Sequence, residues 1–297
     1  MLNKMKPNFK SGFVALIGRP NVGKSSLMNT FVGQKVTIIS DKPQTTRNQI
    51  RGILTGENYQ IVWLDTPGIH KPLHKLGTKM NEKAKAALSS VDLVLWVLDA
   101  GRGYTAGDEK IAAELAACDV PVLLVWNKMD LLEKNAELPQ VAGFDRVFRV
   151  SAQTGEGIDH LLETIIGILP EGPAYYPEDM VTDHPERYIV AELIREQLLI
   201  HTEDEVPHSV AVQVNEMKER DNGKIYIDAV IYVERDSQKG IVIGAKGARL
   251  KAIGRDARQA IEALLDAPVF LNLWVKVRKN WRNNLFFLNE FGYGDED

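Results

Sequence analysis

A stretch near the N-terminus, Gly18 to Ser25, combines residue types at a spacing that suits phosphate binding. It reads G-R-P-N-V-G-K-S, fits the pattern G-x-x-x-x-G-K-S/T, and lies between a strand-like run at 13–17 and a helix-like run from Ser26. Glycines let backbone N–H groups converge on phosphate oxygens, and the following helix points its positive dipole end at the same place. We predict that Lys24 bridges the β- and γ-phosphates of a nucleotide and that Ser25 ligates Mg²⁺. The alternative is a glycine turn with a surface lysine. The predicted nucleotide-binding residues of this loop are Gly18, Arg19, Pro20, Asn21, Val22, Gly23, Lys24, Ser25 and Ser26.

A second group of candidate residues, Asp65 to Gly68, reads D-T-P-G and follows a strand-like run at 59–64. Ligands of such sheets gather beyond the carboxyl ends of the strands, so Asp65 is placed to hold Mg²⁺ through water. Gly68 offers a backbone N–H with little bulk for approach to a γ-phosphate. Alone, this tetrapeptide would as readily be a turn. The predicted nucleotide-binding residues here are Asp65, Thr66, Pro67, Gly68 and Ile69.

A third group, Asn127 to Asp130, follows the strand-like run 120–126 and reads N-K-M-D. A carboxylate at Asp130 can accept hydrogen bonds from N1–H and N2–H₂ of guanine, which adenine does not offer. If that carboxylate is buried, leaving it unpaired costs several kcal/mol, roughly 2–7 for a polar group. We expect Asn127 to tie this loop to the phosphate loop and the stem of Lys128 to cover the base plane. Met129 completes the predicted set, which by itself could be a polar loop.

A weaker signal, Ser151-Ala152, follows the last strand-like run at 147–150. Its order after the N-K-M-D stretch suggests that the backbone N–H of Ala152 meets O6 of guanine. We include Ser151 and Ala152 among the predicted nucleotide-binding residues.

The elements that must position these groups alternate along the first 170 residues. Apolar runs of strand length are separated by helix-patterned segments, which predicts an α/β fold with a mostly parallel sheet. Most of the runs are apolar almost throughout, as expected of strands covered on both faces. The runs are 13–17, 59–64, 91–98, 120–126 and 147–150.

As an ordered set, these motifs resemble the Ras-like GTPases and, with T-T-R at Thr45 to Arg47, the bacterial Era-type branch. The resemblance implies a domain that binds GTP and GDP and uses Mg²⁺. It implies that Thr46, or next Thr45, closes over the metal in a first switch, and that a second switch runs from Gly68 to about Lys79. Implied metal ligands are Ser25, Thr46 and Asp65; implied catalytic residues are Lys24, Thr46 and Gly68.

One position departs from the Ras-like pattern. Where those enzymes carry a glutamine that orients the attacking water, this chain has Ile69. We therefore expect slow intrinsic hydrolysis that a partner or an ion accelerates. Asn21 resembles the phosphate-loop asparagine of GTPases in which K⁺ takes the place of an arginine finger, so K⁺ is an expected activator. Arg47 is the candidate finger within the chain.

The last third of the chain predicts a second, smaller domain. Prolines crowd a linker at 173–185, which separates a GTPase domain at 1–172 from an α+β domain at 186–297. Two short helices meeting at Gly244-Ala245-Lys246-Gly247, next to strand-like runs, predict a KH domain of type II, whose glycine loop holds single-stranded nucleic acid. The alternative is a solvated basic helix face beside a turn. Predicted RNA-binding residues are Ile243, Gly244, Ala245, Lys246, Gly247, Arg249 and Lys251.

The resemblance to the Era-type branch also implies the RNA partner, namely the 3′ end of small-subunit ribosomal RNA during 30S subunit assembly. For the aromatic tail at 281–293, packing on the KH sheet is the expectation; base stacking and membrane contact are the alternatives.

Composition places the chain among water-soluble globular proteins. It has 297 residues, 44% of them hydrophobic and 26% charged, with a formal net charge of −4. Its single cysteine, Cys118, excludes an internal disulfide. The first ten residues lack the apolar core of a signal peptide, and no apolar run approaches the roughly 20 residues that span a bilayer. We expect a cytoplasmic monomer, with peripheral contact at the inner face of the cell membrane left open.

Two other functions compete with an RNA-binding GTPase. A nucleotide kinase would use the same phosphate loop, but Asn127 and Asp130 select guanine and no acceptor lid is recognisable. A membrane-associated GTPase switch would direct its basic domain to anionic lipid instead of RNA.

Overall fold

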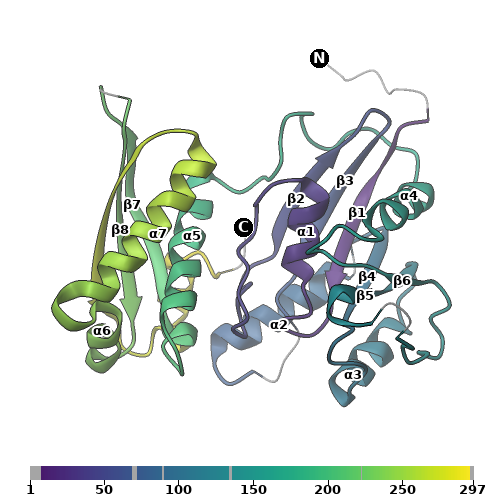
Figure 1. The fold of residues 1–297 in the computed structure, drawn as a ribbon, viewed down its shortest axis with the longest axis horizontal. Helices are drawn as coiled ribbons and strands as arrows, with labels where there is room; N and C mark the ends of the chain where they lie inside the picture. Colours follow the sequence, from purple (N-terminus) through teal and green to yellow (C-terminus); the bar gives the residue numbers. More distant parts are fainter. Residues whose placement is uncertain (1–7, 69–71, 89, 134–135, 222, 295–297) are drawn as a thin grey trace. The chain divides into compact units, whose positions relative to one another are not determined.

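The computed structural model describes residues 8–68, 72–88, 90–133, 136–221 and 223–294 (Figure 1). The chain forms two compact units, which divide at residue 183. Two segments from the first half of the chain, 38–45 and 72–79, belong to the second unit. The division at residue 183 falls inside the proline-rich stretch that was predicted as a linker. No helix in the described part of the chain is long and apolar enough to cross a membrane.

The first unit is built on a six-stranded sheet in the order β2-β3-β1-β4-β5-β6. Strand β2 runs antiparallel to β3 and the other pairings are parallel, which confirms the mostly parallel sheet. The sequence pattern missed β2 because Arg51 and Gly52 interrupt its apolar residues. The strands are β1 (Lys10–Ile17), β2 (Ile50–Thr55), β3 (Tyr59–Asp65), β4 (Leu93–Asp99), β5 (Val122–Asn127) and β6 (Val147–Arg149).

Helices cover this sheet on both faces. On one face, Trp63 of β3 stacks on Phe31 of α1 with ring centroids 4.2 Å apart. Its neighbour Leu64 points to the opposite face, where it shares a buried cluster with Ile111 and Leu115 of α3. This two-sided burial explains why most of the strands read as continuous apolar runs. The helices are α1 (Lys24–Val32), α2 (Lys75–Ala87), α3 (Ala106–Leu115) and α4 (Ile158–Ile168), with a short 3₁₀ turn η1 (Met129–Leu131).

Every predicted nucleotide-site motif in the described chain lies beyond the carboxyl end of a strand. The phosphate loop follows β1, Asp65 ends β3, Asn127 ends β5 and Ser151 lies just after β6. Strand β3 lies on one side of β1 and β4 lies on the other. The order in which the chain adds strands therefore reverses next to the phosphate loop. Such a switch point is where open α/β sheets bind ligands.

The stretch 173–183 packs against the edge of the first unit and contains no helix or strand. The side-chain oxygen of Gln60 accepts hydrogen bonds from the backbone N–H groups of Tyr175 and Tyr176 (2.6 and 2.9 Å). Arg51 and Asp183 form an ion pair at 2.6 Å. The proline-rich segment is therefore held along this edge, which a free spacer would not be.

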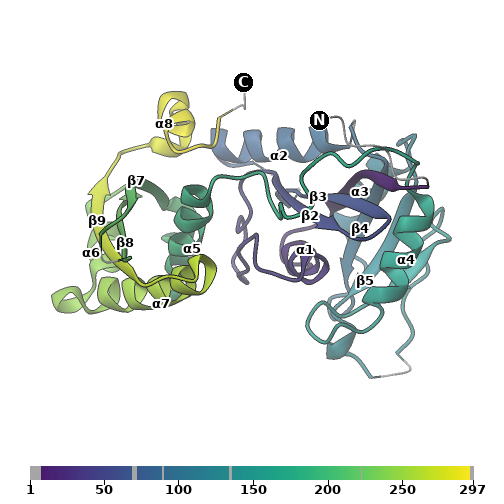
Figure 2. The same cartoon turned by 90° about the horizontal axis from the view of Figure 1, so that it is seen from above.

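The second unit has a three-stranded sheet in the order β7-β8-β9, with β7 antiparallel and β9 parallel to β8. Helices α5 and α7 pack beside each other against it (Figure 2). Its elements are α5 (Glu186–His201), η2 (Pro207–Ser209), β7 (Ala211–Glu219), β8 (Ile225–Val233), α6 (Asp236–Ile243), η3 (Ala245–Gly247), α7 (Ala248–Leu265), β9 (Val269–Val277), η4 (Trp281–Asn283) and α8 (Leu285–Glu290).

This arrangement confirms the α+β domain. Of the two helices that meet at the glycine loop, α6 is short, with 8 residues, and α7 is longer, with 18 residues. Its apolar stripe, Ile253, Ala257 and Ile261, is fully buried in the core of the unit. A helix of that length is stable because it packs this stripe against the sheet and α5.

The aromatic tail packs on the sheet of the second unit, as predicted. Trp281 is fully buried and donates its indole N–H to the carbonyl oxygen of Ser209 at 2.9 Å. Phe291 stacks on Tyr232 of β8 with ring centroids 4.6 Å apart. Phe286 alone among these aromatic residues is largely exposed.

Candidate active site and nucleic-acid interface

The phosphate loop has no room for side chains at its glycines. Gly23 has φ 96°, and a Cβ there would lie 2.2 Å from the side-chain nitrogen of Asn127. A Cβ on Gly18 would lie 2.4 Å from the carbonyl oxygen of Val97. The two glycines therefore let the loop pass close to the ends of β4 and β5, as phosphate-binding loops require.

Lys24 is buried under this loop, with 6% of its surface exposed. Its Nζ donates to the carbonyl oxygens of Gly18 and Arg19 at 3.0 and 2.9 Å. Burial lowers the pKa of Lys24 to about 8, and the nearby Asp65 carboxylate partly opposes this shift. The loop thus holds the ammonium of Lys24 through the carbonyl oxygens of Gly18 and Arg19. When a nucleotide binds, its phosphate oxygens would take the place of these two acceptors.

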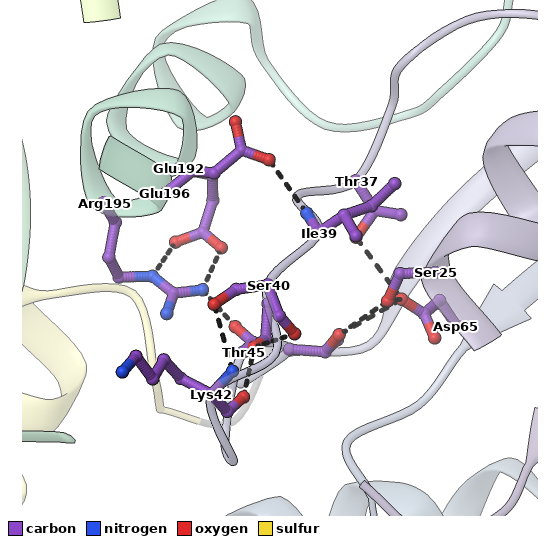
Figure 3. A network of polar contacts seen from close by, with 11 residues as sticks. Ser25, Thr37, Ile39, Ser40, Lys42, Thr45, Asp65, Glu192, Arg195 and Glu196 are labelled. Atoms are coloured by element: carbon purple, nitrogen blue, oxygen red, sulfur yellow. Dashed lines mark hydrogen bonds and ion pairs between the residues drawn. The ribbon is translucent and has the colours of Figure 1, made fainter. Parts of the chain in front are cut away.

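Three hydroxyl groups surround the buried carboxylate of Asp65. Its Oδ2 accepts hydrogen bonds from Ser25 (2.6 Å), Thr46 (3.2 Å) and Thr37 (3.3 Å). The hydroxyls of Ser25 and Thr46 are themselves 3.0 Å apart. The structure thus brings together all three predicted metal ligands and adds Thr37, which no motif marks in the sequence. Figure 3 shows Ser25 and Thr37 beside Asp65.

The other carboxylate oxygen of Asp65, Oδ1, is buried and has no hydrogen-bond partner among the described residues. Burial raises the pKa of Asp65, while Lys24 and the three hydroxyls lower it. An orphaned carboxylate oxygen beside two hydroxyls is a donor set that a hard cation such as Mg²⁺ prefers. The residues present therefore fit a Mg²⁺ ion.

The two threonines of the predicted first switch have different partners. Thr45 donates its hydroxyl to the carbonyl oxygens of Lys42 and Ser40, at 2.6 and 3.3 Å. Thr46 instead hydrogen-bonds Asp65 and Ser25. This geometry favours Thr46 over Thr45 as the residue that reaches the nucleotide site.

The D-T-P-G stretch contacts both the end of β1 and the phosphate loop. Thr66 donates to the carbonyl oxygen of Leu16 at 2.8 Å, and Pro67 is buried. A Cβ on Gly68 would lie 2.7 Å from the backbone nitrogen of Pro20, so only glycine fits there. The predicted residue Ile69 lies outside the described residues.

The two arginines that could serve the nucleotide site are Arg19 of the phosphate loop and Arg47 of the predicted first switch. Arg19 pairs through Nε with Asp108 of α3 at 2.8 Å, and Asp108 also accepts hydrogen bonds from the backbone N–H and hydroxyl of Thr105. Asp108 was not predicted as a partner of Arg19; its local pattern, T-A-G-D, marks only the capping box of α3 that it forms with Thr105. Arg47, the candidate finger, is buried with 2% of its surface exposed, which does not suit a mobile finger.

The N-K-M-D loop is tied to the phosphate loop, as predicted. Asn127 donates to the carbonyl oxygen of Val22 at 3.0 Å. Lys128 donates through Nζ to the carbonyl oxygen of Asn21 and to Asp99, both at 2.7 Å. Because Asp99 neutralises its charge, Lys128 can lay its aliphatic stem beside a base.

The structure adds two details of the predicted base site. The N–H of Ala152 donates to the side-chain oxygen of Asn127 at 3.0 Å, which ties the Ser151-Ala152 stretch to the N-K-M-D loop. Asp130 is exposed. The hydroxyl of Ser151 donates to Asp130 and orients its carboxylate. Met129 forms part of η1, with its N–H on the carbonyl oxygen of Val150 at 3.1 Å.

The glycine loop of the second unit joins α6 to α7. Gly244 has φ 72°, and a Cβ there would lie 2.8 Å from Cβ of Arg249. Gly247 has φ 79°, and a Cβ there would meet no atom within 4 Å. Lys246 and Ala245 between them are exposed. The open side of Gly247 is also the N-terminus of α7, which favours anions.

A groove of about 660 Å³ begins at this loop and runs between α7 and β9. Its floor is apolar and its rim is basic. The lining residues are Gly247, Ala248, Leu250, Lys251, Ala252, Gly254, Arg255, Arg258, Leu271 and Leu273. Of the predicted RNA-binding residues, Gly247 and Lys251 line the groove. Ile243 packs against the core, and Arg249 donates to the carbonyl oxygen of Ile241 at 2.6 Å.

Two family profiles match the chain. Residues 13–128 match the family described as 50S ribosome-binding GTPases, and residues 205–282 match the KH domain. Together with the phosphate loop, the strand-end motifs and the glycine loop, these matches define the class of the protein. It is a P-loop GTPase, an enzyme that hydrolyses GTP, followed by a KH domain.

Curated relatives narrow the class. A GTPase Era from Clostridioides difficile is 50% identical over 296 residues, which covers 97% of this chain and 100% of the relative. A GTPase Era from Staphylococcus haemolyticus is 47% identical over 290 residues, covering 96% and 97%. The chain belongs to the Era family.

Two solved structures are similar over both units. An Era variant from Aquifex aeolicus bound to GDP·AlF₄⁻ has a TM-score of 0.92, with 41% sequence identity. An Era in complex with MgGDPNP and nucleotides 1506–1542 of 16S ribosomal RNA has a TM-score of 0.90, also with 41% identity. Each comparison covers 97% of this chain and 100% of the other.

The lowered pKa of Lys24 predicts pH-dependent nucleotide binding. Phosphate oxygens favour the charged ammonium, so the pKa rises on binding and the protein takes up a proton above about pH 8. The dissociation constant of GTP should be flat from about pH 6.5 to 7.5 and should increase above about pH 8, approaching tenfold per pH unit. Titration with a fluorescent GTP analogue measures it. Lys24→Met should bind more weakly with a flat profile; an equal slope in that variant would contradict the assignment.

The exposed carboxylate of Asp130 predicts a change in base preference. Asp130→Asn places an amide where guanine donates two hydrogen bonds, so GTP affinity should fall by roughly a hundredfold while xanthosine triphosphate binds better. Ser151→Ala, which removes only the orienting hydroxyl, should cost roughly tenfold without changing the base preference. Competition between the two triphosphates measures both effects. Unchanged GTP affinity in Asp130→Asn would rule out this residue as the base reader.

Proposed function

We propose that this GTPase binds the 3′ region of small-subunit ribosomal RNA through its KH groove and acts in assembly of the 30S subunit. The observation that carries the proposal is the coexistence, in one chain, of a nucleotide site with converging hydroxyls and a groove with a basic rim that starts at a glycine loop. The solved Era with nucleotides 1506–1542 of 16S RNA supports this choice, because its similarity extends over both units.

The choice of ribosomal subunit rests on the longer match. The family profile named for the 50S subunit covers only residues 13–128, which include neither the glycine loop nor the groove. The Era structure that holds 16S nucleotides is similar across the residues that form the groove as well. Binding of RNA from the large subunit is therefore an outcome for experiment to exclude.

At the nucleotide site, Ser25, Thr46 and Asp65 would hold Mg²⁺, with Asp65 acting through water. The ion would offset negative charge on the β- and γ-phosphates. Lys24 exchanges its two carbonyl partners for phosphate oxygens, and the backbone N–H of Gly68 lies at the phosphate loop to approach the γ-phosphate. The residues Lys24, Thr46 and Gly68 thus stabilise charge that develops as the phosphoryl group is transferred.

Loss of the γ-phosphate should weaken the contacts of the two switches. Thr46 and Gly68 are the residues that report whether that phosphate is present, one through its hydroxyl and one through its backbone N–H. When both lose their ligand, the segments that carry them become free to rearrange, as GTPase switches do.

At the KH groove, binding combines charge with apolar contact. The N-terminus of α7 and the rim residues Lys251, Arg255 and Arg258 attract phosphates, while Leu250, Leu271 and Leu273 contact bases. A KH groove holds about four unpaired nucleotides. Arg255 and Arg258 form ion pairs with the acidic neighbours Asp256 and Glu262. These pairs lie at the surface, so the arginines can exchange them for phosphates.

A charge placed at Gly247 tests the RNA site. Gly247→Asp puts a carboxylate in open space at the phosphate entrance, so binding of a single-stranded 16S 3′ fragment should weaken by at least about tenfold. Gly247→Asn has nearly the same shape and tolerates the positive φ, so it should bind almost as the natural protein does. Filter binding at several salt concentrations, with a 23S fragment as competitor, measures the effect. Equal RNA affinity in both variants would place the RNA elsewhere.

The assignment of K⁺ as an activator rests on Asn21 and predicts a dependence on the monovalent ion. GTP hydrolysis should be several-fold faster in K⁺ than in Na⁺ at equal ionic strength, and Asn21→Ala should remove most of the difference. Nucleotide affinity should be nearly the same in both salts. Identical rates in the two salts would refute an activating role for K⁺.

A further inference from the structure

The loop that carries the predicted first switch is held by the second unit. Residues 38–45 belong to that unit, and Ile38 is buried in its apolar core. The next residue, Thr46, belongs to the first unit, where its hydroxyl contacts Ser25 and Asp65. One peptide bond therefore separates a residue anchored by α5 from a residue of the nucleotide site.

Helix α5 presents three buried charged side chains to residues 38–45. Arg195 donates through Nη2 to the carbonyl oxygen of Thr45 and is held by Glu192, at 2.7 Å from Nε and 2.5 Å from Nη2. One turn of α5 from Glu192, Glu196 accepts a hydrogen bond from the backbone N–H of Ile39 at 2.9 Å. Figure 3 shows that Glu196 and Arg195 contact opposite ends of the segment 38–45, at Ile39 and at Thr45.

The Arg195 side chain is completely buried at this contact. Its relative exposure is 0%, and its Nη1 has no partner among the described residues. Burial acts to lower the pKa of Arg195, but the charge and hydrogen bonds of Glu192, together with Tyr293 and Tyr188, raise it, and the net pKa lies above its ordinary value. A buried ion pair is often no more stable than apolar residues of the same size, so packing alone does not account for Arg195 here.

We propose that the Arg195–Glu192 pair, assisted by Glu196, is a positioning group for GTP hydrolysis. By fixing the carbonyl of Thr45, it sets the backbone from which Thr46 reaches the site of Asp65 and Ser25. The inference rests on the proposed role of Thr46 at the metal and γ-phosphate. It adds that the KH-bearing unit supplies residues on which the rate of hydrolysis depends.

A displaced Thr46 should affect the triphosphate reaction and spare diphosphate binding, because only the γ-phosphate state uses this switch. Arg195→Met should therefore reduce kcat for GTP hydrolysis in RNA-free buffer by roughly tenfold to a hundredfold, the range caused by misplacement of about 1 Å. It should raise the Mg²⁺ concentration needed for half-maximal rate. GDP affinity should stay within about twofold. Arg195→Lys, which keeps a donor and the charge, should recover part of the rate.

Two companion variants separate positioning from misfolding. Arg195→Met leaves Glu192 buried without its partner, so the double variant Glu192→Gln/Arg195→Met removes both charges and should show the same loss of kcat with a normal circular dichroism spectrum and melting temperature. Arg187→Met makes the same substitution at an exposed position of α5 and should hydrolyse GTP at the natural rate.

The decisive test combines Arg195→Met with Thr46→Ala. If Arg195 acts through Thr46, it causes no further loss of kcat in the Thr46→Ala background, so the two effects are not additive. Additive losses, or full activity in Arg195→Met, would overturn the proposal. Failure of the proposed role of Thr46 is distinguishable, because Thr46→Ala alone would then hydrolyse GTP at the natural rate. Failure of the proposed RNA function would appear separately, as loss of 16S RNA binding by the natural protein in the Gly247 experiment.

Discussion

The nucleotide site depends on one buried carboxylate. Asp65 ends a strand in the interior of the first unit, where a charge without partners is costly. Its Oδ2 is satisfied by hydroxyls from the phosphate loop and from the segment after α1, which are distant in sequence. Its Oδ1 is left for a cation. Because Ser25, Thr37 and Thr46 all point to the same oxygen, a change in the charge at Asp65 would alter the positions of the phosphate loop and the first switch together.

Much of this arrangement was predictable from local pattern. Continuous apolar runs marked five of the six strands, and each motif was placed at a strand end by its position directly after such a run. The glycine loop was identified from its G-x-x-G spacing beside strand-like runs. The edge strand β2 was missed because Arg51 and Gly52 give it no apolar run.

The unpredicted residues share a different property: their roles arise only from tertiary contact. Thr37 has no neighbours in sequence that mark it, and the capping-box pattern of Asp108 gives no sign of its pairing with Arg19; yet one completes the hydroxyl cluster and the other holds Arg19. Arg195 falls within a helix where a charged residue would ordinarily indicate the solvent face. The hydrogen bonds of Asp130 with Ser151 and of Ala152 with Asn127 likewise depend on which atoms the folded loops bring within reach.

The contact between Gly23 and Asn127 has a consequence for how ligands are held. The two residues approach so closely that a Cβ on Gly23 would lie 2.2 Å from the Asn127 side chain, and Asn127 also holds the carbonyl oxygen of Val22 at 3.0 Å. The phosphate loop and the N-K-M-D loop, which we predict to bind the phosphates and the guanine, are therefore in direct contact. Guanosine and pyrophosphate, offered as separate fragments, should not bind independently. When the first fragment orders one loop, the contact between the loops lowers the entropy cost of ordering the other. Binding of the guanine part and of the phosphate part of the intact nucleotide is therefore cooperative.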